Sequence, residues 1–198
     1  MTDNENTWDK LLQIKTSGRD DSHAGQHCYP YEPTPYRVLE RLANSGLIRK
    51  KDVVLDYGCG KGRVDFFLSY QTKARTIGIE YDERIYQNAR DNQKMAVSGS
   101  RTDFVLGRAE EYQVPEAVSR CYFFNPFSLD LLRQVMDKVL DSYRRNPREL
   151  FLLFYYPSKE YLSWLGSVAE LELYEEIVCQ DLFAEPDLRE RIVIFAVR

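Results

Sequence analysis

Apolar residues are grouped along the chain in short runs that alternate with segments of helical spacing. The runs have the length of buried strands and cover residues 53–56, 76–80, 102–106, 121–124 and 149–156. Between them, residues 64–70, 81–95 and 129–140 repeat apolar positions at the spacing of an amphipathic helix. Two last apolar or alternating segments, 170–178 and 191–197, flank a polar stretch and predict an antiparallel pair of strands. This order of elements predicts an α/β fold with a mostly parallel, seven-stranded sheet and an antiparallel C-terminal hairpin.

The first 36 residues have a different pattern. Trp8, Leu11, Leu12 and Ile14 predict a short helix that packs on the domain, and the glycines and proline of residues 17–30 predict a loop. Three prolines between residues 29 and 36 fix an extended path, and a helix is expected over 36–45. Thr34 followed by Pro35 predicts the N-cap of that helix.

Length and charge limit the classes of function. The chain has 198 residues, enough for one α/β domain, and a net charge of −4 argues against a general affinity for nucleic acid. No apolar run reaches the length of a membrane span, and the polar N-terminus is unlike a secretory signal. Together with four cysteines that form no C-x-x-C pair, these features predict a cytoplasmic protein with reduced thiols.

A metal site is one alternative for the N-terminal loop. His23 and His27 are four residues apart and Cys28 adjoins them, which on a helix would suggest metal ligands. Glycines and a proline around them disfavour a helix, and no carboxylate completes a ligand set. We therefore expect no metal.

The strongest chemical signal lies in residues 53–63, with the sequence VVLDYGCGKGR. A buried strand ends near Asp56, and Gly58, Gly60 and Gly62 follow at alternate positions before a helix begins. Glycines allow a tight turn and a close approach of ligand to backbone, while a helix start offers free N–H groups. The dinucleotide fingerprint is G-x-G-x-x-G, and Arg63 stands where its third glycine would fall.

The acid followed by G-x-G-x-G resembles motif I of the class I S-adenosylmethionine-dependent methyltransferases, which have a Rossmann-like, three-layer fold. The resemblance implies that Asp56 lies near the amino group of the cofactor and that the loop with Gly58, Cys59 and Gly60 cradles it. Glu80 ends the next predicted strand, 24 residues after Asp56, near the separation of about 20 at which such an acid binds ribose hydroxyls. The resemblance also implies that Tyr81, the next residue, contacts the cofactor.

The third predicted strand is followed by residues 107–109, Gly-Arg-Ala. In the family this turn is often Gly-Asp-Ala, and its acid bonds the adenine amino group. Arg108 replaces that acid here, so we expect backbone N–H groups at Arg108 and Ala109, or the carboxylate of Glu110, to contact the ring. The alternative is that Glu110 and Glu111 form only a solvated helical turn.

The fourth predicted strand ends in Asn125-Pro126-Phe127, which resembles motif IV of the family, next to the transferred methyl group. Family members that methylate amino nitrogens often have Asp/Asn-Pro-Pro-Tyr/Phe there, and its oxygens orient the target amine. This chain lacks the second proline. We expect Asn125, Pro126 and Phe127 at the catalytic site. Asn125 is expected to contact the cofactor as well. An amino nitrogen is one acceptor that this motif allows. The alternative is that Asn-Pro ends the strand and does nothing more.

The segment before the first core helix resembles stretches of small bacterial methyltransferases in its Tyr-x-Pro-Thr-Pro-Tyr sequence. We expect residues 1–34 to form an arm or lid and residues 35–198 the methyltransferase domain. Tyr31, Thr34 and Tyr36 would cover the cofactor or substrate. The alternative is a rigid cap on the sheet edge.

The sequence thus favours an enzyme that transfers a methyl group from S-adenosylmethionine to an unknown acceptor, whether a small molecule, a protein side chain or RNA. Alternatives are an NAD-dependent oxidoreductase, which Arg63 argues against, and a non-catalytic nucleotide-binding module. A lysine methyltransferase is also conceivable, because its glycine loop and strand acid are similar. The sequence does not indicate an oligomeric state.

Overall fold

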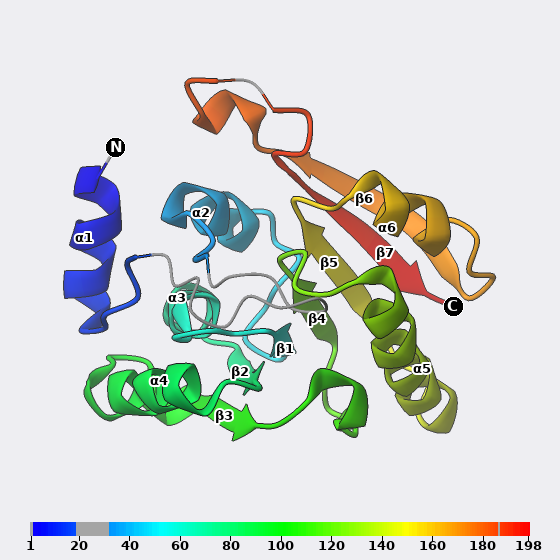
Figure 1. Ribbon diagram of the computed structural model, residues 1–198, viewed down its shortest axis with the longest axis horizontal. Coiled ribbons are helices and arrows are strands. Elements are labelled where there is room, and N and C mark those ends of the chain that lie inside the picture. The colour runs from blue at the N-terminus through cyan, green and yellow to red at the C-terminus, as the bar shows by residue number, and fades with distance from the viewer. Residues whose placement is uncertain (1, 19–31, 186) are drawn as a thin grey trace.

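In the computed structural model, residues 2–18, 32–185 and 187–198 are described. Seven strands form one sheet in the order β3-β2-β1-β4-β5-β7-β6 (Figure 1). The strands are β1 (Val53–Tyr57), β2 (Arg75–Glu80), β3 (Thr102–Leu106), β4 (Arg120–Phe123), β5 (Phe151–Tyr155), β6 (Leu171–Val178) and β7 (Arg191–Val197). Strands β1 to β5 pair in parallel, and β7 pairs antiparallel with both β5 and β6. The predicted α/β fold and its antiparallel hairpin are confirmed.

Helices cover both faces of the sheet. They are α1 (Thr2–Leu12), α2 (Tyr36–Asn44), α3 (Arg63–Thr72), α4 (Glu83–Met95), α5 (Leu129–Arg145) and α6 (Lys159–Leu165). Three short 3-10 turns are η1 (Gly99–Arg101), η2 (Ala109–Glu111) and η3 (Gln180–Leu182). None of the helices in the described residues is long and apolar enough to cross a membrane.

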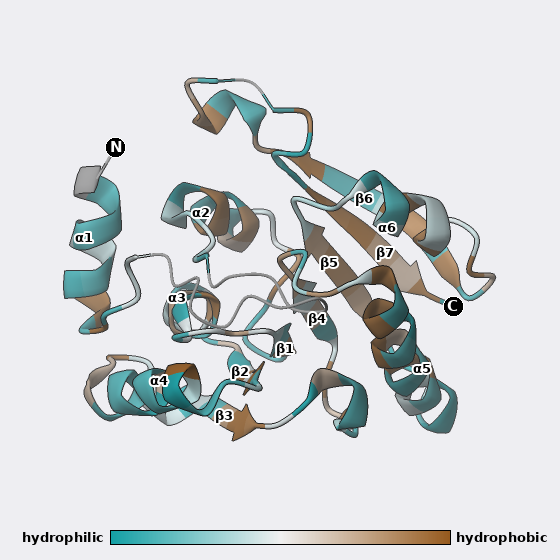
Figure 2. Ribbon diagram, viewed as in Figure 1, coloured by the Kyte–Doolittle hydropathy of each residue, from teal (hydrophilic) through white to brown (hydrophobic). Residues whose placement is uncertain are grey.

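Two hydrophobic clusters form the core, one on each face of the sheet. One joins α1, α2, α3 and α4 to the sheet, and the other joins α5 and α6 to it. Strands β4 and β5 are buried along their whole length, because helices cover both of their faces. Helix α5 turns its apolar side to the sheet and its polar side outward (Figure 2).

Helix α1 confirms the helix predicted near the N-terminus. Leu12 is fully buried, and the ring of Trp8 packs edge-on against Phe67 of α3 at 4.9 Å between centroids. Leu11, by contrast, is half exposed. Residues 2–18 therefore pack on the core of the domain through α2 and α3.

Two local predictions were wrong. Thr34 is not the N-cap of α2, because its hydroxyl is used by Tyr122 and the helix begins at Tyr36 after Pro35. The first N–H of the helix, that of Tyr36, donates instead to the carboxylate of Glu5 in α1 at 3.1 Å. The amphipathic spacing of residues 81–95 also predicts that Met95 faces inward, but Met95 is 66% exposed because it is the last residue of α4.

Candidate active site

The loop after β1 takes the tight course that its three glycines predict. Gly58, Gly60 and Gly62 have φ of 74°, 58° and 84°, a region that other residues rarely enter. The N–H groups of Gly58 and Cys59 both donate to the carbonyl of Ile79 at the end of β2, at 3.0 Å. The loop is thus fixed to the carboxyl end of the neighbouring strand, and α3 begins directly after it.

Glu80 connects this loop to the start of α4. Its Oε2 accepts from the N–H of Gly60 at 3.0 Å, and its Oε1 accepts from those of Tyr81 and Asp82 at 2.9 Å. Burial raises the pKa of the Glu80 carboxyl, and the three N–H groups oppose that rise. Asp82 in turn caps α4 by accepting from the N–H groups of Arg84 and Ile85. Glu80 therefore fixes the shape of the loop. The sequence predicted only a contact with ribose for Glu80 and did not predict this structural role.

Asp56 lies beneath the loop in contact with a second acid, Asp65 of α3. Both are buried, and the Oδ2 of Asp56 and both carboxyl oxygens of Asp65 have no hydrogen-bond donor. Burial raises the pKa of Asp56 to about 7, the hydrogen bond with Asp65 opposes that rise, and the charge of Glu80 adds to it. Burial and the charge of Asp56 raise the pKa of Asp65 well above its usual range. Sequence reasoning missed Asp65, although an acid inside the apolar run of α3 is an unusual feature.

A pocket of about 390 Å³ opens beside the loop, between the ends of β2 and β3 and the start of α5. Its volume is within the range of about 300–1,000 Å³ that is usual for small-molecule sites. Predicted site residues that line it are Gly58, Tyr81, Arg108, Ala109, Glu110 and Phe127. We call it the α5 pocket. A single turn, η2, takes the place of a helix between β3 and β4, which leaves this side of the sheet open.

Arg108 and Glu110 form an ion pair at the rim of the α5 pocket. The Nε of Arg108 donates to Oε1 of Glu110 at 2.6 Å, and Arg108 also lies 3.7 Å from Glu111. The Arg108 side chain is 65% exposed, whereas that of Glu110 is 12% exposed. Glu110 is therefore the more enclosed of the two acids, and Glu111 is the solvated one.

The Asn125-Pro126-Phe127 turn lies directly against the glycine loop. A Cβ on Gly58 would come within 3.1 Å of the Cβ of Pro126, which explains why glycine is needed there. Asn125 is half-buried and has φ of 41°, and none of the hydrogen bonds of the described residues involves its side chain. Tyr161 of α6 holds the turn: its hydroxyl donates to the carbonyl of Phe127 at 2.6 Å and accepts from the N–H of Phe127 at 3.2 Å. Nothing in the sequence signalled Tyr161.

A second, smaller pocket lies on the other side of Gly58. Its lining includes Asp56, Cys59, Tyr122 and Phe124, and residues 32–34 from the segment before α2. We call it the Asp56 pocket. The hydroxyls of Thr34 and Tyr122 are 3.0 Å apart and share a hydrogen bond. Gly58 lines both pockets, so the two pockets adjoin at this residue.

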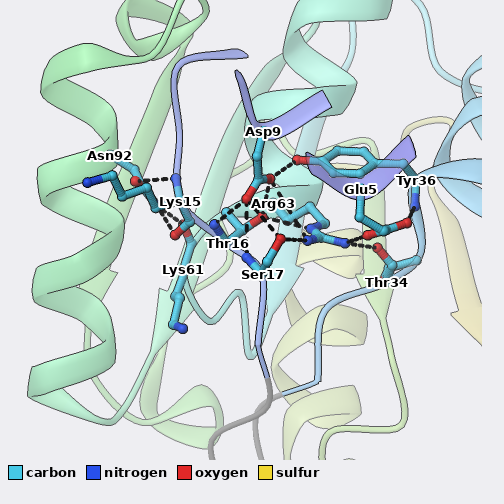
Figure 3. A network of polar contacts seen from close by, with 10 residues as sticks. All are labelled: Glu5, Asp9, Lys15, Thr16, Ser17, Thr34, Tyr36, Lys61, Arg63 and Asn92. Carbon is cyan, nitrogen blue, oxygen red and sulfur yellow. Dashed lines mark hydrogen bonds and ion pairs between the residues drawn. The ribbon is translucent and has the colours of Figure 1, made fainter. Parts of the chain in front are cut away.

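Arg63, the first residue of α3, joins the N-terminal segment to the glycine loop (Figure 3). Its buried guanidinium pairs with Glu5 and lies 3.9 Å from Asp9. It also donates to the hydroxyl of Thr16 at 2.8 Å and to the carbonyl of Thr34 at 3.3 Å. One arginine therefore holds both α1 and the segment 32–34 that covers the Asp56 pocket.

Tyr36 belongs to this network around Arg63 and lies away from both pockets. It is fully buried, its hydroxyl donates to Oδ1 of Asp9 at 2.5 Å, and the Arg63 guanidinium stacks on its ring at 4.3 Å. The role expected for Tyr36 over the cofactor is thus replaced by a structural one, because its ring is needed under Arg63. Thr34 does lie at the Asp56 pocket, whereas Tyr31 and the residues His23, His27 and Cys28 lie outside the described part of the chain.

An aromatic wall adjoins the Asp56 pocket at the ends of β4 and β5. The rings of Phe124 and Tyr155 are 4.7 Å apart, and the ring of Tyr156 meets Phe124 edge-on at 6.5 Å. Two acids accept hydrogen bonds from this wall: the hydroxyl of Tyr155 donates to Glu190, and that of Tyr156 donates to Asp187, each at 2.6 Å. Burial raises the pKa of Glu190, and the charge of Asp187 adds to that rise.

The chain is similar to known methyltransferases. The sequence pattern of a family described as a methyltransferase domain matches residues 54–147. A protein-lysine N-methyltransferase of Saccharolobus islandicus (strain REY15A) is 30% identical over 113 residues, which are 56% of this chain and 70% of that protein.

Solved structures show the same fold. An RNA methyltransferase from Salinibacter ruber, in complex with S-adenosyl-L-homocysteine, superposes with a TM-score of 0.62 at 20% identity, over 84% of this chain and 94% of that one. A methyltransferase from Geobacter sulfurreducens, in complex with the same molecule, has a TM-score of 0.56 at 15% identity, over 73% of this chain and 66% of that one. Three findings agree: the order of strands in the sheet, the glycine loop between two strand-end acids, and the relative that methylates protein lysine. The chain therefore belongs to the class I S-adenosylmethionine-dependent methyltransferases.

Proposed function

We propose that this enzyme methylates an amino nitrogen, and that its acceptor is a lysine side chain of a protein. The observation that carries the proposal is the contact between the Asn125-Pro126-Phe127 turn and Gly58 of the glycine loop. An acceptor amine held by this turn would lie beside the ligand that the loop holds. Asn125 of this turn offers a side-chain oxygen that none of the hydrogen bonds among the described residues uses.

The two pockets suit the two ends of S-adenosylmethionine. We assign its adenine to the α5 pocket, between Tyr81, Ala109 and the carboxylate of Glu110, with Arg108 outside at the rim. We assign its amino-acid end to the Asp56 pocket, where Oδ2 of Asp56 has no hydrogen-bond donor among the described residues. Gly58, Cys59 and Gly60 lie between the two, and Glu80 lies below them for the ribose. This use of the site residues is supported by the family to which the chain belongs and by the orphaned oxygen of Asp56.

The cofactor supplies an electrophilic methyl group on a sulfonium, and the protein supplies position. Transfer requires a neutral amine whose lone pair points at the methyl carbon. The Asn125 oxygen and backbone carbonyls of the turn would accept hydrogen bonds from the two N–H groups and so direct the lone pair. The proton that the lysine ammonium loses beforehand passes to solvent.

The aromatic wall supports a cationic acceptor. Phe124 and Tyr156 present rings, and rings attract ammonium groups through their electron-rich faces. Asp187 and Glu190 stand behind the tyrosines and add negative charge. The relative from Saccharolobus islandicus is a protein-lysine N-methyltransferase, which agrees with this class of acceptor.

The segment before α2 completes the site in this proposal. Residues 32–34 would close the Asp56 pocket over the cofactor, with residues 1–34 as the arm that carries them and residues 35–198 as the methyltransferase domain. The Tyr-x-Pro-Thr-Pro-Tyr sequence of this segment also supports a place among small bacterial methyltransferases.

The proposal is tested by methyl transfer from radiolabelled S-adenosylmethionine to protein, RNA and small-amine acceptors. We expect label in protein, on lysine after acid hydrolysis. Asn125→Ala should lower turnover at least about 100-fold and change the affinity for S-adenosylhomocysteine by less than about threefold. Asn44→Ala, an exposed residue at the end of α2, is the matched control.

Label in RNA alone would contradict the lysine acceptor. Equal losses of turnover and cofactor affinity in Asn125→Ala would contradict the role of this residue in orienting the amine.

A further inference from the structure

Asp65 is a buried acid that the assigned roles leave unexplained. It lies in the first turn of α3, is 0% exposed, and contacts the carboxyl group of Asp56. Within residues 2–18, 32–185 and 187–198, neither of its carboxyl oxygens has a donor in hydrogen-bonding geometry. The nearby hydroxyl of Thr76 points to the backbone carbonyl of Asp65 instead, at 3.5 Å.

Among the described residues, no N–H or O–H group lies in hydrogen-bonding geometry to Oδ2 of Asp56 or to either carboxyl oxygen of Asp65. Two touching carboxyl groups in such a site cannot both be ionised, because like charges at this distance repel strongly when water is excluded. The pair must therefore hold a proton. Asp56 lines the Asp56 pocket, where water or a ligand can reach it, whereas Asp65 is sealed beneath it. The negative charge is more favourable on the residue that a ligand can reach, so the proton belongs to Asp65.

We propose that Asp65 is a positioning residue for the cofactor: as a neutral acid it donates its proton to Asp56 and so holds Asp56 as a carboxylate that accepts the ammonium of the cofactor. This inference goes beyond the proposed acceptor, because it concerns cofactor binding alone and holds for any acceptor.

The other groups around the pair do not supply this proton. Glu80 at the end of β2 is itself an acid and accepts three backbone N–H bonds. Arg63 lines the same pocket, but its guanidinium is committed to Glu5, Asp9 and Thr34. In the part of the chain that the structure describes, the remaining titratable groups near the pair are Cys59 of the loop, Tyr122 of β4 and Glu32 of the segment before α2. Burial raises the pKa of the Cys59 thiol and of the Tyr122 hydroxyl, so both stay neutral.

The proposal couples cofactor binding to a proton. Because Asp56 has a pKa of about 7 before a ligand binds, it is partly protonated at neutral pH. A cationic ammonium beside it favours the ionised form, and binding then expels the proton of Asp56 while that of Asp65 stays. Affinity should fall as the pH drops below about 7, since a growing fraction of Asp56 must first lose its proton.

The experiment is calorimetric titration with S-adenosylhomocysteine between about pH 5.5 and 8.5, in two buffers of different ionisation enthalpy that report the protons released. Wild type is compared with Asp65→Asn, which keeps a neutral donor of the same shape, and Asp65→Val, which removes it. Asp56→Asn removes the group that titrates. Asp137→Asn, an exposed position on α5, is the matched control.

We expect wild type and Asp65→Asn to bind with the same pH midpoint and to release a similar fraction of a proton. Asp65→Val should bind about 10- to 100-fold more weakly at pH 7, with its midpoint moved up by about one unit, because Asp56 loses a charge-assisted hydrogen bond. Asp56→Asn should bind weakly at every pH with the proton release lost.

Loss of affinity in Asp65→Asn equal to that in Asp65→Val would overturn the proposal, because it would show that Asp65 acts as a carboxylate. An unchanged midpoint in a folded Asp65→Val would also overturn it, since Asp65 would then be only structural. Should Asp65→Val fail to fold, infrared spectra decide: wild type must show the band of a buried, protonated carboxylic acid that Asp65→Asn lacks, and its absence refutes the proposal.

Discussion

Asn125 and Tyr156 follow the adjacent strands β4 and β5, and both adopt the left-handed backbone conformation, with φ of 41° and 53°. This conformation costs free energy in residues other than glycine and is concentrated at functional sites. Asparagine tolerates it better than tyrosine does, so Tyr156 is the more unusual of the two. The sequence predicted Asn125 through its motif, but it gave no sign of Tyr156, because backbone strain depends on contacts between strands that are remote in sequence.

Glu80 combines a structural role with the proposed ribose contact. Glu80→Ala should weaken binding of S-adenosylhomocysteine by about 1.5–3 kcal/mol, because a charge-assisted hydrogen bond is lost and the N–H of Gly60 loses its acceptor. Calorimetry measures this, with the exposed Glu83→Ala of α4 as control. An affinity equal to that of the control would show that Glu80 only shapes the loop.

The buried acids make stability depend on pH in an unusual direction. The pKa of Asp65 is raised above its value in the unfolded chain, so the folded state binds more protons, and stability is lost as the pH rises from about 4 toward that raised pKa. Asp65→Asn cannot ionise and should have a higher Tm than wild type at pH 8. The increase should be roughly 2–4 °C for each kcal/mol of destabilisation that the substitution removes. Thermal unfolding at pH 5 and pH 8 tests this, and a Tm difference that does not grow with pH would contradict it.

At the scale of elements, the hydrophobic pattern predicted the strands and most helices because each buries a continuous run or one clear face. The start of α2 was predicted less well. Thr34 has the right residue type for a cap, but its hydroxyl lies against Tyr122, and Glu5, which lies 31 residues before Tyr36, accepts the first N–H. No local rule could predict this, because the capping group comes from another helix.

The connection between α1 and the glycine loop rests on one side chain. Arg63→Gln leaves the carboxylates of Glu5 and Asp9 without their cation in a partly buried site, and should cost about 3–5 kcal/mol of unfolding free energy. It should also weaken binding of S-adenosylhomocysteine, because Arg63 holds residues 32–34 over the Asp56 pocket. Urea unfolding and calorimetry measure the two effects.

The matched control is Arg75→Gln, which breaks an ion pair with Asp103 whose members are 69% and 59% exposed. We expect a loss below about 1 kcal/mol there. Similar losses of unfolding free energy in both variants would show that the burial of Arg63 does not increase its contribution to stability.

At the scale of the whole molecule, the site lies at the carboxyl ends of the parallel strands, where open α/β sheets bind ligands. The positions of Asp56, Glu80 and Asn125 at three of these ends were predictable, because each acid or amide ends an apolar run. Asp65 and Arg63 were not predicted in their roles. Their significance depends on which groups lie across the folded chain from them, and that is set by packing.

The opposite end of the sheet provides a contrast. Arg120 at the start of β4 is 1% exposed, donates to the carbonyl of Leu47 at 2.6 Å, and pairs with Glu149 and Asp52. Arg120→Met should lower stability by about 3–5 kcal/mol while the affinity for S-adenosylhomocysteine stays within about twofold. Urea unfolding measures the free energy of unfolding, and calorimetry on the same sample measures the affinity. A large loss of affinity would contradict the prediction, because it would show that Arg120 affects the structure of the site at the other end of β4.

The order of strands has a consequence for the newly made chain. Strand β6 lies at the sheet edge and pairs with β7, the strand that follows it in sequence and that separates it from β5. A ribosome delivers β6 before its partner exists, with Leu173, Tyr174 and Val178 on its surface. Until β7 emerges, this ribbon is open to pairing with strands of other molecules. Strand β7, which follows the other six strands of this sheet along the chain, inserts between β5 and β6, so the sheet of the methyltransferase core is complete only after β7 has been translated.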